Sequence, residues 1–365
     1  MKICHVHLRN FLSTKGYTWG LKGLAKKGHQ VTLICGGNTQ KRRVYFEDGI
    51  RVIELPLRIN ISPATGILKS LVPELMKIKT DVFHVRHYQS FLPEITAIVA
   101  KFRSIPIVLS VHSTFREGQK WYIKYPEFIY SILIQPFLPL FSKIIFISNY
   151  VKNGYTFNLI PEKKKRVIYN CISTYEINKS EKVKRDKYTI LYIGRQAKEK
   201  GVDILLRAIA LIKNKCPSIR LIIAGDRGRI NDKREIRYLI KKLALKDKII
   251  FTGWLDGRKK WELMQKSTII VVPSRNEALG MTAVEGLAAG VPLIVSDAGA
   301  LPEVVGEYGL IFKNGDIKDL ADKLTEALRG NVKMSGALDY VLDKFGEEKM
   351  INRLIKIYSD ISTKK

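Results

Sequence analysis

The stretch 271–299, VVPSRNEALGMTAVEGLAAGVPLIVSDAG, constrains the fold of this chain more than any other. The β-branched run 269–272 has the length and composition of a buried strand, and a Pro-Ser break then leads into a loop. The sequence from about Gly280 to Ala289 predicts a helix, which ends at Gly290. A second apolar strand follows. Strand, loop, helix and strand in this order form the repeating unit of a parallel α/β sheet.

Two carboxylates lie near the expected carboxyl end of the first strand, where ligands bind in such sheets. Glu277 is in the loop and Glu285 is inside the helix. The helix start leaves the amides of Gly280, Met281 and Thr282 unpaired, and their partial positive charge suits a phosphate. Glu285 could accept hydrogen bonds from a ribose, and Glu277 from a sugar hydroxyl. The alternative is a surface helix residue and an ordinary loop charge.

A second group of candidate residues follows the strand ILYI, where Gly194-Arg195 precede Lys200. A glycine after a strand permits a sharp turn. Arg195 and Lys200 could then neutralise a diphosphate, the arginine through its planar fork and the lysine as a point charge. The alternative is a solvated loop with a salt bridge to Glu199.

Two further positions suit a ligand. His112 ends the strand PIVLSV, where an imidazole can donate to a sugar hydroxyl or a developing charge. Gly16 lies in the first strand-helix loop and would let the backbone approach a ligand closely. A structural histidine and a simple turn glycine are the alternatives.

The alternation of strands and helices runs through the whole chain and predicts two doubly wound α/β domains. The polar, charged stretch 171–188 has no apolar period and separates them as a linker. We therefore expect an N-terminal domain over 1–174 and a C-terminal domain over 175–343. A basic helical tail over about 344–365 is a candidate to pack back on the first domain. Local predictions include a strand at Ile50–Leu55 and a helix near Ile67–Lys77.

The formal net charge of +29 attracts nucleic acid, anionic lipid surfaces or phosphorylated ligands, unless it reflects only a lysine-rich solvated surface. The apolar run Phe128–Ile147 contains two prolines and Lys143, which excludes a membrane span. Aromatic and basic residues over 120–130 precede it and suit a membrane interface, or else the core of the first domain. Four widely spaced cysteines indicate reduced thiols in a cytosolic chain.

Some motifs are absent from the sequence. It has no DxD or HExxH at a predicted strand end, no Cys/His cluster with zinc spacing, and no GxxxxGK[ST]. We therefore expect no metal and no cofactor, and a diphosphate would have to be held by protein cations and amides.

Taken together, the motifs resemble the family-4 retaining glycosyltransferases of the GT-B fold. The similar text includes LAKKGHQVTLI, VLSVHSTF, IIFISNYVKN, ILYIGRQAKEKGVDILLRAIALI, LIIAGD, IIFTGWL and the stretch 271–299 with ALPEVVG after it. The resemblance covers most of residues 1–315. It implies two Rossmann-like domains facing each other across a cleft, with a nucleotide-sugar donor bound mainly by the C-terminal one. An acceptor would be held by the N-terminal one, and the aromatic and basic residues over 120–130, with the net charge, suggest a lipid-linked molecule or a saccharide.

The resemblance also implies roles for the candidate residues. Arg195 and Lys200 match the pair on the donor diphosphate, Glu277 the residue against the transferred sugar, and Glu285 the residue on the ribose. His112 matches the histidine beside the sugar. The implied catalytic residues are His112, Glu277, Arg195 and Lys200, and the implied donor-binding residues are Gly16, Gly194, Arg195, Lys200, Glu277, Leu279, Gly280, Met281, Thr282 and Glu285.

Three departures from the family pattern limit the match. Gly16 is followed by Tyr17 where the family often has a second glycine. Glu277-Ala278-Leu279-Gly280 replaces the usual EGFG, which leaves the donor sugar open. Asn170-Cys171 replaces Asn-Gly at the hinge.

No residue stands out as a nucleophile, so we expect front-face attack, in which the leaving diphosphate takes the acceptor's proton. A GT-B sugar-nucleotide epimerase and a non-enzymatic nucleic-acid-binding protein are the competing interpretations. Only the net charge supports the nucleic-acid-binding interpretation, and we expect no nucleic acid partner. The expected location is cytoplasmic, with peripheral attachment to the inner face of the membrane as a further hypothesis.

Overall fold

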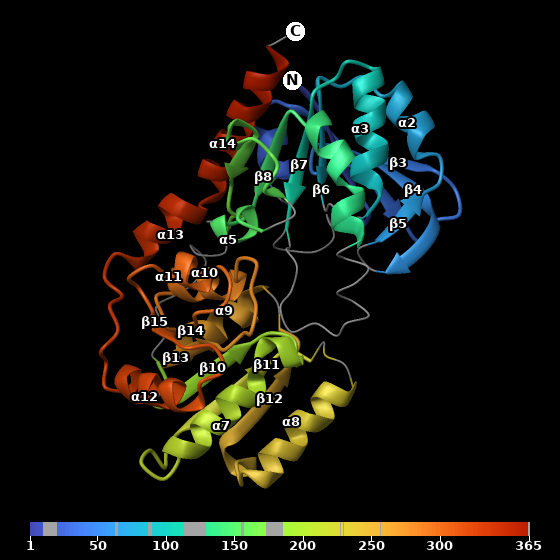
Figure 1. Cartoon of the computed structure of the whole chain (residues 1–365). Coiled ribbons are helices and arrows are strands. Elements are labelled where there is room, and N and C mark those ends of the chain that lie inside the picture. Colours follow the sequence, from blue (N-terminus) through green and yellow to red (C-terminus); the bar gives the residue numbers. More distant parts are fainter. Residues whose placement is uncertain are drawn as a thin grey trace. The chain divides into compact units, whose positions relative to one another are not determined.

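A computed structural model of the chain describes residues 1–9, 20–62, 65–86, 90–112, 129–154, 157–172, 185–226, 228, 230–255 and 257–363. These residues form two compact units (Figure 1). The first unit comprises Met1–Cys171 and Glu347–Lys365, and the second comprises Ile172–Gly346. Both are α/β units built on largely parallel sheets, as the sequence predicts. The expected linker begins at this division, and its residues 173–184 lie outside the described part.

The first unit is built on a sheet with the order β3-β4-β2-β1-β6-β7-β8-β9 among the described residues, and β5 pairs with β4. All neighbours are parallel except β3 with β4 and β4 with β5. The order reverses direction between β1 and β6, as in a doubly wound sheet. The strands are β1 Lys2–His7, β2 Gln30–Gly37, β3 Arg43–Glu47, β4 Ile50–Ser62, β5 Thr65–Leu68, β6 Val82–Arg86, β7 Ile107–Val111, β8 Lys143–Phe146 and β9 Lys165–Val167.

Helices cover both faces of this sheet. On one face α1 and α14 form a common apolar core with β1, β2 and β4. Gly23 makes this packing possible, because a Cβ there would lie 1.9 Å from Cδ1 of Ile351. The helices of this unit are α1 Leu21–Lys26, α2 Leu71–Lys77, α3 Leu92–Phe102, α5 Asn149–Lys152 and α14 Glu347–Ser362, with 3₁₀ turns at Gln135–Leu140 and Glu162–Lys164.

One local prediction in this unit is wrong. The strand expected over Ile50–Leu55 continues to Ser62, and the first residues of the helix expected near Ile67–Lys77 form strand β5 instead. The two strands form an antiparallel hairpin in which Leu57 is paired with Leu68. Cross-strand pairing thus overrides the helical spacing of the apolar residues, and the helix begins only at Leu71.

The second unit has a fully parallel sheet with the order β12-β11-β10-β13-β14-β15. The chain starts in the middle at β10, builds outward to β12, and returns to the other side of β10 with β13. The carboxyl ends of β10 and β13 therefore meet at the topological switch point, where α/β sheets form their sites. The strands are β10 Thr189–Ile193, β11 Arg220–Ala224, β12 Ile249–Gly253, β13 Ile269–Val272, β14 Leu293–Ser296 and β15 Leu310–Phe312.

The helices of the second unit also lie on both faces of the sheet. One face packs against α7 and α12 in a single apolar core. Asp316 caps α12, because its carboxylate accepts from the amides of Lys318 and Asp319. The helices are α7 Val202–Ile212, α8 Ile230–Lys242, α9 Gly257–Lys266, α10 Met281–Ala288, α11 Leu301–Val305, α12 Ile317–Leu328 and α13 Ala337–Phe345, with 3₁₀ turns at Lys198–Lys200 (η4) and Lys246–Lys248 (η5).

The chain ends in two helices where the sequence predicts one. α13 belongs to the second unit, the backbone is extended at Gly346, and α14 returns to the first unit. α14 buries Met350, Ile351, Leu354, Ile357 and Tyr358. Within the described residues, the structure contains no helix that is both long enough and apolar enough to span a bilayer.

Candidate functional site

The loop after β10 presents the two expected cations. Two hydrogen bonds to its backbone fix this loop. The Gly194 amide donates to the carbonyl of Ala224, and the Tyr192 hydroxyl donates to the Arg195 carbonyl at 2.6 Å. Burial raises the pKa of Tyr192, and the charge of Glu277 raises it further, so this hydroxyl stays protonated. The Arg195 side chain forms the ion pair with Glu199 that the sequence suggested as its structural alternative, at 3.0 Å and with both side chains well exposed.

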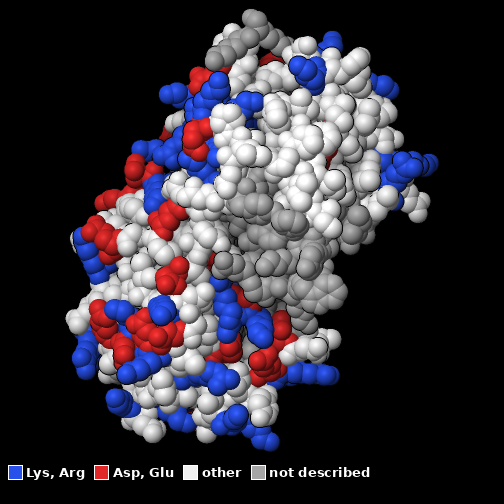
Figure 2. Space-filling model, viewed as in Figure 1, with Lys and Arg blue, Asp and Glu red and all other residues white. Residues whose placement is uncertain are grey.

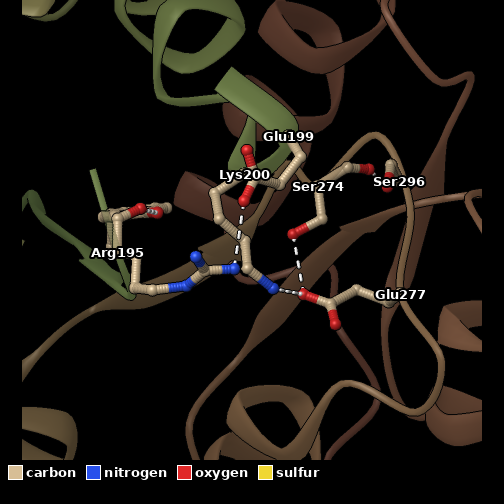
Figure 3. Close-up of polar contacts among 7 residues, drawn as sticks. Arg195, Glu199, Lys200, Ser274, Glu277 and Ser296 are labelled. Atoms are coloured by element: carbon tan, nitrogen blue, oxygen red, sulfur yellow. Dashed lines mark hydrogen bonds and ion pairs between the residues drawn. The ribbon is translucent and has the colours of Figure 1, made fainter. Parts of the chain in front are cut away.

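Lys200, at the end of the same loop, meets Glu277 from the loop after β13 (Figure 3). Lys200 Nζ lies 2.5 Å from Glu277 Oε1, and the Ser274 hydroxyl donates to the same oxygen at 2.9 Å. Ser274 is itself fixed, because its carbonyl accepts from the buried hydroxyl of Ser296 on β14. Three parallel strands, β10, β13 and β14, therefore place one carboxylate and one ammonium group together.

Arg275 also connects the two loops. Its guanidinium donates to both carboxylate oxygens of Asp203, at 2.8 and 2.7 Å, and to the carbonyl of Lys198 at 2.6 Å. The hydrogen bonds to Asp203 raise the pKa of Arg275. Gly201 adds a second contact: it has a φ of +68° and lies so close to Pro273 that a Cβ would be 1.8 Å from the proline carbonyl. Only glycine fits that position.

The start of α10 lies next in the chain. Gly280 precedes the helix in a left-handed conformation, and the first intrahelical bond is donated by Ala283. The amides of Met281 and Thr282 therefore come before the hydrogen-bonded turns, at the positive end of the helix dipole. Leu279, the preceding residue, is buried.

Glu285 lies one turn into α10 and is 8% exposed, so it is not the surface helix residue of the alternative interpretation. Its Oε1 accepts from Lys260 Nζ on α9 at 2.6 Å. A carboxylate has several acceptor lone pairs, so Glu285 could accept from a ligand hydroxyl as well as from Lys260.

The structure thus brings most of the predicted donor residues to one edge of the second unit. Gly194, Arg195 and Lys200 follow β10, whereas Glu277, Gly280 and the α10 start follow β13. His112 follows β7 in the first unit and is partly buried there. Gly16 and the aromatic stretch 120–128 lie outside the described residues.

Four residues of this edge are not found by sequence reasoning. Ser274 directly follows a predicted strand, and strand-end position is the signal that could have found it. Ser296 ends the next strand and carries the same signal, whereas Arg275 and Lys260 have partners that are distant in the sequence. Chemically, the predicted residues at this edge combine two cations, a helix start and two carboxylates, which suits a ligand that has both phosphates and hydroxyls.

Comparison with known proteins finds glycosyltransferases among the relatives of this chain. Residues 173–340 match the family model described as glycosyl transferases group 1, and residues 21–176 match the model described as glycosyltransferase family 4. An uncharacterized glycosyltransferase of Methanocaldococcus jannaschii is 30% identical over 77% of this chain and 76% of its own length. The N-acetyl-alpha-D-glucosaminyl L-malate synthase of Bacillus anthracis is 26% identical over 93% of this chain and 91% of its own.

Solved structures share the fold at low sequence identity. Sucrose-phosphate synthase from Thermosynechococcus elongatus superposes with a TM-score of 0.77 and 18% identity over the whole of both chains. The Anabaena protein HepE in complex with UDP gives a TM-score of 0.75 and 17% identity over 99% of this chain and 100% of its own.

Proposed function

Since this chain belongs to the family-4 glycosyltransferases of the GT-B fold, we propose that it moves a hexose-type sugar from a nucleotide diphosphate sugar to an acceptor with retention at the anomeric carbon. The acceptor class is a lipid, a saccharide or a glycoconjugate. The observation that carries the proposal is the meeting of Lys200 and Glu277 beside the start of α10.

The donor would occupy the carboxyl edge of β10 and β13. Lys200, Arg195 and the amides of Met281 and Thr282 supply the positive charge that a diphosphate needs. Glu285 would accept from the ribose hydroxyls. When phosphate oxygens replace Glu277 as the partner of Lys200, Glu277 Oε1 becomes available to accept from a hydroxyl of the transferred sugar.

The proposed transfer is a front-face substitution. The bond between the anomeric carbon and the diphosphate oxygen breaks, and the bond to the acceptor oxygen forms on the same face of the sugar. The acceptor's proton goes to the departing diphosphate oxygen. Lys200, Arg195 and the α10 amides would stabilise the charge that develops on that oxygen. His112 would donate to a sugar hydroxyl.

The proposal includes no metal, because protein cations and amides would neutralise the diphosphate. Activity is expected to survive EDTA and to gain nothing from added Mg²⁺ or Mn²⁺. A loss of turnover in EDTA that Mg²⁺ restores would contradict this part of the proposal.

Thermal stabilisation across a panel of nucleoside diphosphates tests donor binding. HepE, which is similar in fold, was crystallised with UDP, so UDP is the first nucleotide to test and GDP the second. One strong shift in melting temperature with UDP or GDP supports the proposal. A shift only with oligonucleotides would reject it in favour of a nucleic-acid-binding protein.

The rival enzyme, a sugar-nucleotide epimerase, is separated by its products. It would release free nucleoside diphosphate and an altered sugar from the donor alone. A transferase forms a new glycoside, and its rate of nucleotide release rises when the acceptor is added.

We also propose that the protein works at an anionic membrane surface, for which its net charge of +29 is the support. Flotation with anionic vesicles at low and high salt tests this. Binding at low salt that high salt abolishes is expected, and no binding at low salt would end the hypothesis.

A further inference from the structure

A groove of about 1090 Å³ lies on the first unit, away from the carboxyl ends of its strands. It is formed where β1, β2 and β4 begin, and α2 with the segment after it forms one wall. It exceeds the usual volume of a pocket for one small ligand, so it has room for an extended molecule.

The floor of the groove is one face of the sheet. Thr32 on β2 and Phe46 on β3 are both register partners of Arg51 on β4. Cross-strand partners point to the same face, so these three side chains form a row across the strands. α2 leaves the end of this row uncovered, and Phe46 is 75% exposed.

The walls carry an excess of positive charge. Five cations line the groove against one acid, Glu74, and that acid is occupied by Arg42 through two hydrogen bonds at 2.7 and 3.0 Å. Among the residues that the structure describes, the other four cations form no ion pair: Lys2, Arg51, Lys77 and Lys79. Asp81 is nearby and accepts from the backbone amide of Lys2, but it does not line the groove.

The wall that carries Lys77 and Lys79 is held in place. Arg103, which follows α3, donates to the carbonyls of Leu75 and Ile78 on either side of the end of α2. The Arg42–Glu74 contact connects the same helix to the segment before β3. The cations are therefore presented on a fixed frame.

The chain as a whole has 63 Lys and Arg residues against 34 Asp and Glu, and the five-to-one excess in the groove is higher than this ratio. On the face displayed in Figure 2, Lys and Arg are interspersed with Asp and Glu along the second unit. A polyanion that meets such a mixed surface gains less than one that meets several unpaired cations around a groove.

We propose that this groove binds an anionic saccharide chain, one that carries carboxylate or phosphate groups along its length. A flat bilayer cannot enter a concave site, and a single aromatic residue cannot form the stacking series by which grooves hold single-stranded nucleic acid. Phe46 instead offers one apolar face to a sugar ring, with Arg51 beside it for an acidic group. The choice of a saccharide rests on the proposed function, and the groove would hold the polymer at the amino ends of the strands of the first unit.

Fluorescence anisotropy with a labelled carboxylated oligosaccharide, oligogalacturonate, tests the proposal at low salt. The groove variant Arg51→Glu/Lys79→Glu is compared with Arg237→Glu/Lys241→Glu, which makes the same charge change on exposed residues of α8. Neutral maltooligosaccharide, a single-stranded oligonucleotide and anionic vesicles are the comparison probes. The nucleotide-induced melting shift is measured in each variant as an independent check on fold and donor binding.

The expected result is that the groove variant binds oligogalacturonate at least about tenfold more weakly than wild type, while the α8 variant stays within about twofold. Phe46→Ala is expected to weaken binding with the salt dependence unchanged. Equal loss in both charge variants would overturn the proposal, as would binding of wild type to oligonucleotide or vesicles but not to oligogalacturonate. If the saccharide test fails but the nucleotide still raises the melting temperature, the groove proposal is rejected and the proposed transferase function is not. If saccharide binding is intact but the nucleotide causes no shift, the proposed transferase function is rejected and the groove proposal is not.

Discussion

Replacement of Arg275 by Met tests whether this side chain holds the two loops of the candidate donor site together. The Arg275 side chain donates three hydrogen bonds, two to Asp203 and one to the Lys198 carbonyl. Methionine keeps the length and apolar stem of the side chain and removes all three. The loop with Lys200 then loses these connections to the loop with Glu277, while the Lys200–Glu277 contact and the bond from the Arg275 amide to the Glu199 carbonyl remain.

The magnitude follows from the exposure of the pair. Hydrogen bonds to charged groups contribute about 1.5–3 kcal/mol each when buried, whereas exposed ion pairs contribute about 0–1 kcal/mol. The side chains of Arg275 and Asp203 are 32% and 22% exposed, between these limits. We expect a loss of about 2–3 kcal/mol in the free energy of unfolding, and the melting temperature of a unit of this size then falls by about 4–12 °C.

Calorimetric melting of matched variants provides the measurement. Arg258→Met is the control, because Arg258 and Glu262 form an i,i+4 pair on α9 with side chains 76% and 40% exposed, and its loss is expected to cost less than about 0.5 kcal/mol. A double-mutant cycle with Asp203→Asn isolates the coupling. If Arg275→Met melts within about 1 °C of wild type, or no lower than Arg258→Met, the two loops are not held together by this residue.

Three further outcomes are expected. Lys200→Ala lowers turnover more than tenfold on the true donor, because the diphosphate loses its point charge, and near-wild-type kinetics would reject the phosphate role. Glu285→Ala raises the KM for the donor about tenfold or more while Glu262→Ala leaves it unchanged, and an unaltered donor KM in Glu285→Ala would contradict the ribose assignment. His84 is buried between Tyr358 and Ser110, and burial lowers its pKa, with the charges of His5 and Arg86 adding to the effect. The unfolded chain binds a proton near pH 6.5 that the folded unit does not, so the free energy of unfolding is constant above that pH and falls below it, by up to about 1.4 kcal/mol per pH unit for this histidine. Denaturant titrations from pH 7.5 to 5 should show a shallower slope for His84→Gln, and a stability that rises as the pH falls would refute the assignment.

Much of the fold follows from local sequence. The apolar runs, the helical periods and the glycine and proline breaks place strand, loop, helix and strand correctly around Glu277 and around Lys200. The helix start at Gly280 is also local, since a single glycine and the following small residues determine it. Where pairing with a neighbouring strand competes with a helical pattern of apolar residues, the sequence misleads, as in the hairpin of β4 and β5.

Parts of the site could not be predicted in this way. Lys260 and Glu285 are on different helices, and Ser296 reaches Ser274 from a different strand. The bonds they form depend on which helices and strands pack together. The cationic groove at the start of β1, β2 and β4 has the same origin, because its cations come from separate strands and from the segment after α2.

By itself, the sequence determined that this chain has two α/β units, that Arg195 and Lys200 follow one strand, and that Glu277 and Glu285 follow another. Only the tertiary structure decided that these strands, β10 and β13, are neighbours, so that Lys200 meets Glu277 although 77 positions separate them. The reason is physical: the hydrophobic period is a property of each segment, whereas the order of strands in a sheet is set by how all the segments pack together.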